Sequence, residues 1–183
     1  VSDLDGDQDL DIVIGGKWFE NEYPIWTEYN YAEWYPNAAV KVADFNNDGR
    51  NDIVLTPSEL AGGVFKISWY EQPVNHSENW VEHLVQDSTE TVVHAVEAAD
   101  FNNDGWVDIV SAEMHQGRDP DEVSIFVNHN AGEVWTKMVV SEKGSHLVQV
   151  ADIDLDGDMD VMGANWSGPH QPIEIWLNRV DEK

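Results

Sequence analysis

Short runs in which hydrophobic residues alternate with polar ones recur along the chain and flank four polar windows. Ahead of three windows the pattern reads Val40-Lys-Val-Ala, Val96-Glu-Ala-Ala and Val148-Gln-Val-Ala, and after the four windows it reads Asp11-Ile-Val-Ile, Asp52-Ile-Val-Leu, Asp108-Ile-Val-Ser and Asp160-Val-Met-Gly. A period of two residues, rich in β-branched side chains, is typical of strands. We therefore predict that each window is a loop that joins two strands, and we find no convincing helical period.

Each unit contains two more predicted strands after its window. The third strand is an aromatic or β-branched run that ends in a polar residue, at residues 18–21, 66–70, 124–128 and 174–178, and the fourth opens with Trp26, Trp80 or Trp135. The first aspartates of successive windows lie 41, 56 and 52 residues apart. Four short antiparallel strands in a repeat of this length indicate a blade of a β-propeller.

The predicted strands amount to about three and a half blades. Only Val1 and Ser2 precede the first window, and unit four stops after its third strand at Asn178. We interpret residues 1–183 as one partial, all-β propeller of four-stranded antiparallel blades, with units around residues 3–11, 44–52, 100–108 and 152–160. Because unpaired strand edges invite pairing, the chain is either a fragment of a larger ring or is completed by further copies. A lone four-bladed ring, whose two ends share a blade, is the third alternative.

The windows read DLDGDQDLD, DFNNDGRND, DFNNDGWVD and DIDLDGDMD, and they hold 16 of the 20 aspartates. Each has Asp or Asn at positions 1, 3 and 5 and Asp at position 9. Carboxylates this crowded repel one another, so the folded state needs a counter-charge. Oxygen ligands at alternating positions around a sharp turn are typical of Ca²⁺ loops, in which position 7 binds through its backbone carbonyl. The alternatives are acid-rich turns without metal and Mg²⁺, which is disfavoured because it keeps its waters.

The predicted calcium ligands are positions 1, 3, 5, 7 and 9 of each window: Asp3, Asp5, Asp7, Asp9 and Asp11; Asp44, Asn46, Asp48, Arg50 and Asp52; Asp100, Asn102, Asp104, Trp106 and Asp108; Asp152, Asp154, Asp156, Asp158 and Asp160. These are not EF-hands, because position 12 is never Glu and a strand rather than a helix follows. The first site is the least regular, since Gln8 stands at position 6, where the turn favours Gly.

The pattern D-x-[DN]-x-D-G-x-x-D-[IV], with a strand on each side, resembles the FG-GAP/VCBS repeats, a family of calcium-binding β-propellers that includes the head of the integrin α-subunit. The resemblance extends over nearly the whole chain, four times. It implies a calcium-binding propeller module. Similar propellers also occur in polysaccharide lyases and sugar dehydratases, so an enzyme that acts on carbohydrate is an alternative by analogy.

Charge and composition narrow the partners and the compartment. The chain has 36 acidic and 9 basic side chains, a net charge of −27, and no cysteine. It lacks the Lys/Arg surface that a nucleic acid or an anionic membrane requires, and it has no apolar run long enough to cross a bilayer. Nine Trp, five Tyr and five Phe argue against a disordered acidic tail. Calcium loops of modest affinity fill where calcium is near millimolar, so we predict a secreted protein, extracellular or periplasmic.

The loops at the other ends of the strands are expected to converge on the face opposite the windows. His94 and His146 each stand six residues before the first Asp of their window. The loops after the second strands add His115 and Glu113 in unit three, Asn165, Trp166 and His170 in unit four, and Trp18 in unit one.

Three interpretations of this face are open. In the first, the histidines hold neighbouring blades together. In the second, Trp166 and Trp18 stack on a sugar whose hydroxyls bind to Asn165 and His170. In the third, the face is catalytic: His94 or His146 acts as general base with help from His115 or Glu113. A transition metal on the histidines is a weaker version, because their spacings match no metal signature.

We therefore expect a calcium-stabilised β-propeller repeat module that binds a glycan or a protein partner. The alternatives are a polysaccharide lyase or sugar dehydratase with a His-based site, and a structural spacer. We expect neither nucleic acid nor membrane insertion, and we expect a homo-oligomer or part of a larger propeller.

Overall fold

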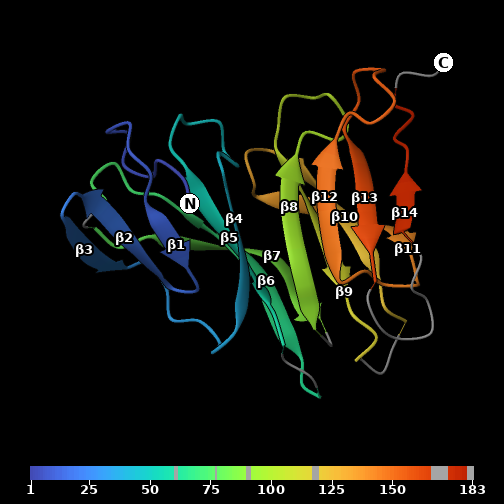
Figure 1. Ribbon diagram of the computed structural model, residues 1–183, viewed down its shortest axis with the longest axis horizontal. Coiled ribbons are helices and arrows are strands. Elements are labelled where there is room, and N and C mark those ends of the chain that lie inside the picture. Colours follow the sequence, from blue (N-terminus) through green and yellow to red (C-terminus); the bar gives the residue numbers. More distant parts are fainter. Residues whose placement is uncertain (60–61, 77, 90–91, 117–119, 166–172, 181–183) are drawn as a thin grey trace.

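The computed structural model describes residues 1–59, 62–76, 78–89, 92–116, 120–165 and 173–180. In this part of the chain, fourteen strands form four antiparallel sheets, and there is no helix (Figure 1). The described residues accordingly contain no helix of the length and apolarity needed to span a membrane. The all-β prediction is confirmed.

Each sheet is a meander whose strands follow one another in chain order. The first sheet contains β1 (Ile12–Ile14), β2 (Lys17–Glu22) and β3 (Ile25–Asn30); the second contains β4 (Ala38–Ala43), β5 (Asp52–Pro57), β6 (Phe65–Glu71) and β7 (Val81–Thr89). The third contains β8 (Val93–Ala99), β9 (Asp108–Glu113), β10 (Val123–His129) and β11 (Val134–Ser141); the fourth contains β12 (Leu147–Ala151), β13 (Asp160–Ala164) and β14 (Ile173–Trp176).

The predicted strand pattern matches these sheets closely. The windows join β4 to β5, β8 to β9 and β12 to β13. In the first sheet an isolated bridge between Ser2 and Asp11 stands in place of an inner strand, and in the described chain β14 is the last strand of the fourth sheet. The inventory of about three and a half blade-like sheets is therefore confirmed.

The four sheets stand side by side in chain order, with the first and fourth at opposite ends of the molecule (Figure 1). Their inner strands are neighbours, since β8 packs against both β4 and β12. The described chain thus forms an open row of sheets. It is not the lone four-bladed ring, in which the first and last sheets would meet.

Hydrophobic side chains pack between successive sheets, and we call each packed interface a seam. The residue at position 2 of a window lies at the centre of each seam: Leu4, Phe45 and Phe101 are 2%, 0% and 4% exposed. They are buried because the following sheet covers them. The core of the protein is therefore a series of seams between sheets, and each seam needs two sheets to form.

The two end sheets expose the residues that elsewhere fill seams. On the fourth sheet Ile153, Met162 and Ile175 are 38%, 37% and 50% exposed, whereas the equivalents of Met162 in the second and third sheets, Val54 and Val110, are fully buried. On the first sheet Ile12 and Ile14 are likewise exposed, whereas Ile53 and Leu55, at the same positions of the second sheet, are buried. Each end thus presents one half of a seam.

Candidate metal centres and the opposite loop face

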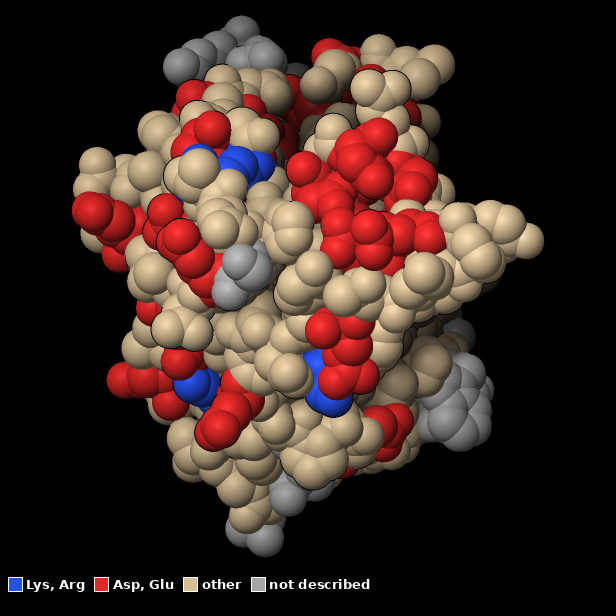
Figure 2. Space-filling model, turned by 90° about the vertical axis from the view of Figure 1, so that its left-hand side faces the viewer, with Lys and Arg blue, Asp and Glu red and all other residues tan. Residues whose placement is uncertain are grey.

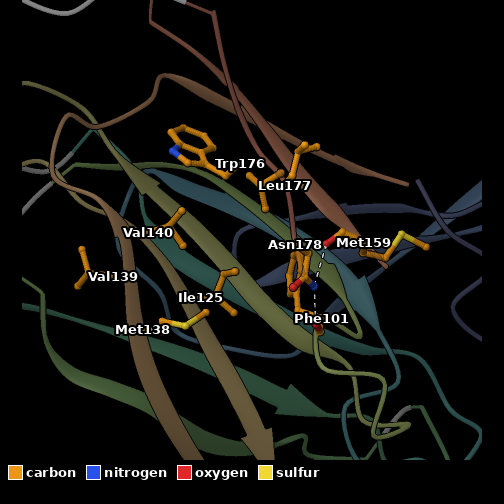
Figure 3. A pocket seen from close by; sticks show the side chains of 10 residues that line it. Phe101, Ile125, Met138, Val139, Val140, Met159, Trp176, Leu177 and Asn178 are labelled. Carbon is orange, nitrogen blue, oxygen red and sulfur yellow. Dashed lines mark hydrogen bonds between the residues drawn. The ribbon is translucent and has the colours of Figure 1, made fainter. Parts of the chain in front are cut away.

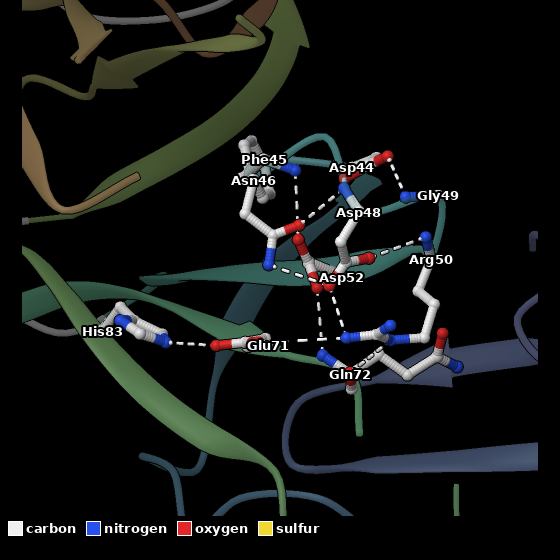
Figure 4. A network of polar contacts seen from close by, with 10 residues as sticks. All are labelled: Asp44, Phe45, Asn46, Asp48, Gly49, Arg50, Asp52, Glu71, Gln72 and His83. Carbon is white, nitrogen blue, oxygen red and sulfur yellow. Dashed lines mark hydrogen bonds and ion pairs between the residues drawn. The ribbon is translucent and has the colours of Figure 1, made fainter. Parts of the chain in front are cut away.

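The second, third and fourth acidic loops share one hydrogen-bonded conformation, shown for the second loop in Figure 4, and the first loop differs from it at one bond. The carboxylate of Asp44, at position 1, accepts hydrogen bonds from the backbone N–H groups of Asp48 at 3.1 Å and Gly49 at 2.9 Å. Asp100 and Asp152 make the same bonds, from Asp104 and Gly105 and from Asp156 and Gly157. Asp3 differs, because it accepts from positions 4 and 6 of its loop, Gly6 and Gln8. The position-5 carboxylate of every loop accepts from the N–H of position 7.

The aspartate at position 9 anchors each loop to its sheet. Asp52 accepts the N–H of Phe45 at 3.0 Å and that of Gln72, just beyond β6, at 2.9 Å. Asp11, Asp108 and Asp160 make the same two bonds in their units. All four are fully buried. Burial raises the pKa of Asp52 to about 7 and that of Asp108 to about 6, so the ionised carboxylates favour a nearby cation.

In the second, third and fourth sheets, a side-chain amide at the end of the third strand ties the unit to the preceding one. Gln72 donates to the carbonyl of Leu4 at 2.5 Å, Asn128 to that of Phe45 at 2.8 Å, and Asn178 to that of Phe101 at 2.5 Å. Asn21, in the first sheet, donates to Leu10 of its own loop instead. The sequence analysis missed this role, although the recurring Asn or Gln at one position of the repeat was its signal.

Two positions of each loop adopt the left-handed backbone conformation. Position 6 has φ of 81° at Gln8, 85° at Gly49, 88° at Gly105 and 99° at Gly157. The prediction that this turn favours Gly is therefore confirmed, and Gln8 adopts the conformation at a cost of about 1 kcal/mol. Position 4 is also left-handed, which the sequence analysis missed; it is occupied by Gly6, Asn47, Asn103 and Leu155.

The donor set fits a hard divalent cation such as Ca²⁺. Among the described residues, two groups of carboxylates bring potential ligand oxygens within 4.8 Å of one another: Asp3, Asp5 and Asp11, and Asp152, Asp154 and Asp156. In the first loop, Oδ1 of Asp9 is buried without a hydrogen-bond partner. Desolvation and the neighbouring carboxylates raise the pKa of Asp9 and of Asp154. Crowded carboxylates of this kind resist ionisation when no cation is near, and a bound calcium ion would stabilise their ionised form.

The second loop carries part of its own counter-charge. The guanidinium of Arg50 pairs with Asp48, lies 3.9 Å from Glu71, and donates through Nε to the carbonyl of Gln72 (Figure 4). Elsewhere basic groups are scarce. Figure 2, which faces the end of the molecule where the first sheet lies, shows clusters of acidic side chains and few Lys or Arg. In the fourth loop Arg179 lies 3.8 Å from Asp154. With 9 basic against 36 acidic side chains in the whole chain, protein cations can offset only part of the loop charge.

On the opposite loop face, His94 and His146 come together as predicted. Their rings lie 4.4 Å apart between centroids, and Nε2 of His94 lies 2.5 Å from Oε1 of Glu59. The His94 side chain is 19% exposed, so the pair is reachable from solvent. Burial and the neighbouring His94 lower the pKa of His146. In the described chain these three side chains do not form a tight metal-ligand group, which gives the transition-metal interpretation no support.

The other candidates on this face have structural contacts. Glu113 is buried and accepts the N–H of Glu122 at 2.9 Å, and the amide of Asn165 donates to the carbonyls of Lys143 and Gly144. His115 is partly exposed, with its Nδ1 buried. Trp166 and His170 lie outside the described residues.

The prediction that Trp18 lines a ligand site was wrong. Trp18 is fully buried in the first seam and stacks on Tyr29 at 4.8 Å, with His76 at its edge. The turn that was expected to hold it is Gly15-Gly16, because Ile14 pairs directly with Lys17. Two glycines between alternating runs are a hairpin signal that the sequence offered.

The loop geometry and the strand order agree with a comparison to known families. Two overlapping stretches, residues 44–111 and 100–163, match the family model of the FG-GAP-like repeat. Together they span well over half of the chain. The chain belongs to the FG-GAP-like repeat family. Among curated proteins, none matches this chain.

The matched FG-GAP-like repeats contain the second, third and fourth acidic loops and leave out the first. The first loop nevertheless makes the same hydrogen bonds at positions 5 and 9, and at position 1 it keeps the bond from position 6 while taking its second bond from position 4. Its departure at Gln8 is accommodated by the backbone. The first unit is therefore built like the FG-GAP-like repeats that follow it.

Proposed function

We propose that this chain is a calcium-stabilised FG-GAP-like repeat module that binds a glycan or a protein partner through the loop face opposite the acidic loops. The observation that carries the proposal is that four loops rich in carboxylates share the hydrogen bonds of positions 5 and 9 and the left-handed turns at positions 4 and 6. Calcium would be held by the side-chain oxygens of positions 1, 3, 5 and 9 and by the backbone carbonyl of position 7. It would supply positive charge and crosslink each loop, and it would take no part in chemistry.

The compartment follows from the same chemistry. FG-GAP repeats are typical of extracellular proteins. Loops that need calcium to offset their repulsion fill most readily where calcium is near millimolar. We therefore propose an extracellular or periplasmic location, where the stabilising ion would always be present.

The proposed ligand contacts are His94, at the start of β8, and His146 and Glu59, which lie in loops of the same face of a rigid scaffold. We expect His94→Ala to weaken binding at least tenfold, a loss of about 1.4 kcal/mol, in a panel of neutral and acidic polysaccharides measured by calorimetry with calcium present. The matched control is His129→Ala, because His129 is exposed at the end of β10, where its ring contacts Thr136 of the neighbouring strand β11. Chelating calcium should also abolish binding by loosening the scaffold.

The same panel separates the alternatives. An increase in absorbance from unsaturated sugar would show that the protein cleaves a polysaccharide. It would identify an enzyme and overturn the proposal of a binding module. Equal binding by wild type and His94→Ala would place the ligand site elsewhere. If the wild type binds none of the polysaccharides and His94→Ala lowers the melting temperature, the histidines have a structural role. That result would favour the structural spacer over the binding module.

We also propose that the two end faces pair with further units of the same kind, either head to tail between copies of the chain or within a larger propeller of which the chain is a part. The exposed Ile153, Met162 and Ile175 face of the fourth sheet and the exposed Ile12 and Ile14 face of the first sheet are the two halves of one seam. Such a heterologous contact repeats until a ring closes. Light scattering should therefore give a mass at least twice the 20.7 kDa of one chain.

A pair of matched variants tests this association. Met162→Glu places a charge in the proposed contact and should return the protein to a monomer. Val81→Glu, on the outer strand β7 in the middle of the row, changes an equally apolar exposed residue and should leave the mass unchanged. A monomeric wild type at high concentration would show that the end faces do not pair.

A further inference from the structure

The asparagines at position 4 of the second and third loops reach into the loop that follows. Nδ2 of Asn47 donates to the carbonyl of Gly105 at 2.8 Å, and Nδ2 of Asn103 donates to Oδ1 of Asp158 at 2.6 Å. These contacts join residues that are 58 and 55 positions apart in the sequence. Each acceptor lies at position 6 or 7 of its own loop, where the backbone carbonyl of position 7 is a proposed calcium ligand. Neighbouring loops are therefore connected directly as well as through their sheets.

In the third loop this connection continues through one peptide group to a proposed calcium ligand. The carbonyl of Gly105 and the N–H of Trp106 belong to the same peptide group. The carbonyl accepts from Asn47, and the N–H donates to Oδ1 of Asp104 at 2.9 Å. Because the two bonds polarise the peptide group between them, each strengthens the other. At the other end, Asn47 stands between positions 3 and 5 of the second loop, which are also proposed ligands.

The other pairs of loops are connected as well. In the fourth loop Asp158, the acceptor of the bond from the third loop, donates its backbone N–H to Oδ1 of Asp156 at 3.0 Å. In the first loop position 4 is Gly6, which has no side chain to donate. Here Asn51 of the second loop donates to the carbonyl of Asp3 at 2.7 Å. Each loop thus has a hydrogen bond to a neighbouring loop.

The backbone conformation of position 4 does not by itself require asparagine. Asn47 and Asn103 have φ of 56° and 58°, in the left-handed region that Asn tolerates well. Leu155 has φ of 65° at the same position of the fourth loop, and its side chain is 85% exposed. The loop can therefore form without an amide at position 4. What the two asparagines add is the bond to the next loop.

We propose that calcium binds to these loops with positive cooperativity, and that Asn47 and Asn103 transmit the effect of one bound ion to the next loop. The inference rests on the proposed binding of calcium. An ion in the second loop would hold positions 3 and 5, on either side of Asn47, and would so fix its amide. The amide would then hold the Gly105–Trp106 peptide group in place. A second ion would find a loop that is already ordered, so its binding would lose less conformational entropy.

The charges of the ions act in the opposite direction. Each bound Ca²⁺ adds two positive charges, which weaken the attraction of the remaining loops for the next ion. Electrostatics alone therefore predicts that successive ions bind more weakly. Positive cooperativity requires coupling through the structure, and it would fill the loops together over a narrow range of calcium concentration.

Binding to the third loop can be followed separately, because Trp106 is the one tryptophan in the four windows. Terbium(III) takes the same oxygen ligands as calcium and emits light when an adjacent tryptophan is excited. The luminescence of terbium added to the intact, metal-free protein therefore reports on the third loop. Trp106→Phe should remove most of this signal, which assigns it to that loop.

Two substitutions in the second loop form the test. Asp44→Asn removes the charge of a proposed ligand and should weaken terbium binding at the third loop about fivefold, the ratio that the net free energy of one hydrogen bond gives. Asn47→Gly keeps the left-handed conformation and removes the amide. In the Asn47→Gly background, Asp44→Asn should have no further effect on the third loop. Such a double-mutant cycle separates coupling from independent losses.

The fourth loop provides a second cycle and a matched control. Coupling is reciprocal, so Asp152→Asn should also weaken terbium binding at the third loop, and Asn103→Gly should remove that effect. Leu155→Gly makes the same kind of change at position 4 of the fourth loop, but the side chain that it removes is exposed. Leu155→Gly should leave the affinity of the third loop within twofold of the wild type.

The outcomes distinguish this inference from the calcium proposal on which it rests. An unchanged affinity of the third loop in Asp44→Asn would overturn the coupling. An equal loss with and without Asn47 would also overturn it, and would assign any cooperativity to folding of the whole chain. Saturable terbium binding in either case would leave the calcium proposal intact. If neither terbium luminescence nor heat of calcium binding is observed, both proposals are wrong.

Discussion

Removing calcium is expected to lower the melting temperature of this protein by tens of degrees. Sixteen aspartates lie in four loops, and the buried Asp52 and Asp108 have raised pKa values when no cation is near. A ligand that binds only the native state contributes about 2.7 kcal/mol per site at a hundredfold excess over its Kd. For a chain of this size that corresponds to about 5–10 °C for each filled site.

Calorimetry measures both halves of this prediction. A titration of metal-free protein with calcium should approach four ions per chain, and scans with calcium and with a chelator should differ as stated. Magnesium at the same concentration should restore much less, because it dehydrates reluctantly and rarely takes an all-protein cage. Identical melting curves with calcium and with chelator would contradict the proposal that calcium stabilises the fold.

Single-site variants localise the effect. Asp104→Ala removes the position-5 carboxylate of the third loop and should lower the melting temperature in calcium by about 5–10 °C, the share of one site. Asp87→Ala removes an exposed aspartate of β7 that belongs to no loop and should change it little. Since both variants lose one negative charge, a difference between them reports on the metal site rather than on net charge.

Asn128→Ala is expected to destabilise the protein by about 2–4 kcal/mol, because it leaves buried backbone groups without partners. The amide of Asn128 donates to the carbonyls of Phe45 and Val107, and its Oδ1 accepts the N–H of Gly132 at 2.7 Å. The side chain is fully buried. One residue thus connects the second loop, the third loop and the turn before β11. The midpoint of chemical denaturation in calcium measures the loss.

The repeat supplies both a control and a rescue for this variant. Asn21 stands at the same position in the first sheet, yet its amide makes one exposed hydrogen bond, to Leu10 at 3.2 Å. Asn21→Ala should therefore cost less than about 1 kcal/mol. Asn128→Gln should recover part of the stability, because Gln72 makes the equivalent contact in the second sheet. Equal losses for Asn21→Ala and Asn128→Ala would contradict the proposed role of the amide in joining units.

The sequence alone determined the local parts of this protein. The strands on either side of each window, the turn at position 6 and the number of strands all follow from interactions within about nine residues. The hydrogen bonds from Asp48 and Gly49 to Asp44 span four and five residues, so the spacing of the aspartates is enough to specify the loop. The period of the repeat then predicted that His94 and His146 would lie together, because equivalent positions in neighbouring units are neighbours in space.

The tertiary structure decided what crosses from one sheet to the next. Whether Trp18 faces solvent or core depends on which side of β2 the second sheet covers, since successive side chains of a strand point to opposite faces. The hydrogen bond from Asn128 to Phe45 joins residues that are 83 positions apart in the sequence, and the contact between Glu59 and His94 joins residues that are 35 positions apart. The pocket that Ile125 and Trp176 line lies where the third and fourth sheets pack against each other (Figure 3). Such features depend on how whole sheets pack against each other, and a local pattern of residues carries no information about that packing.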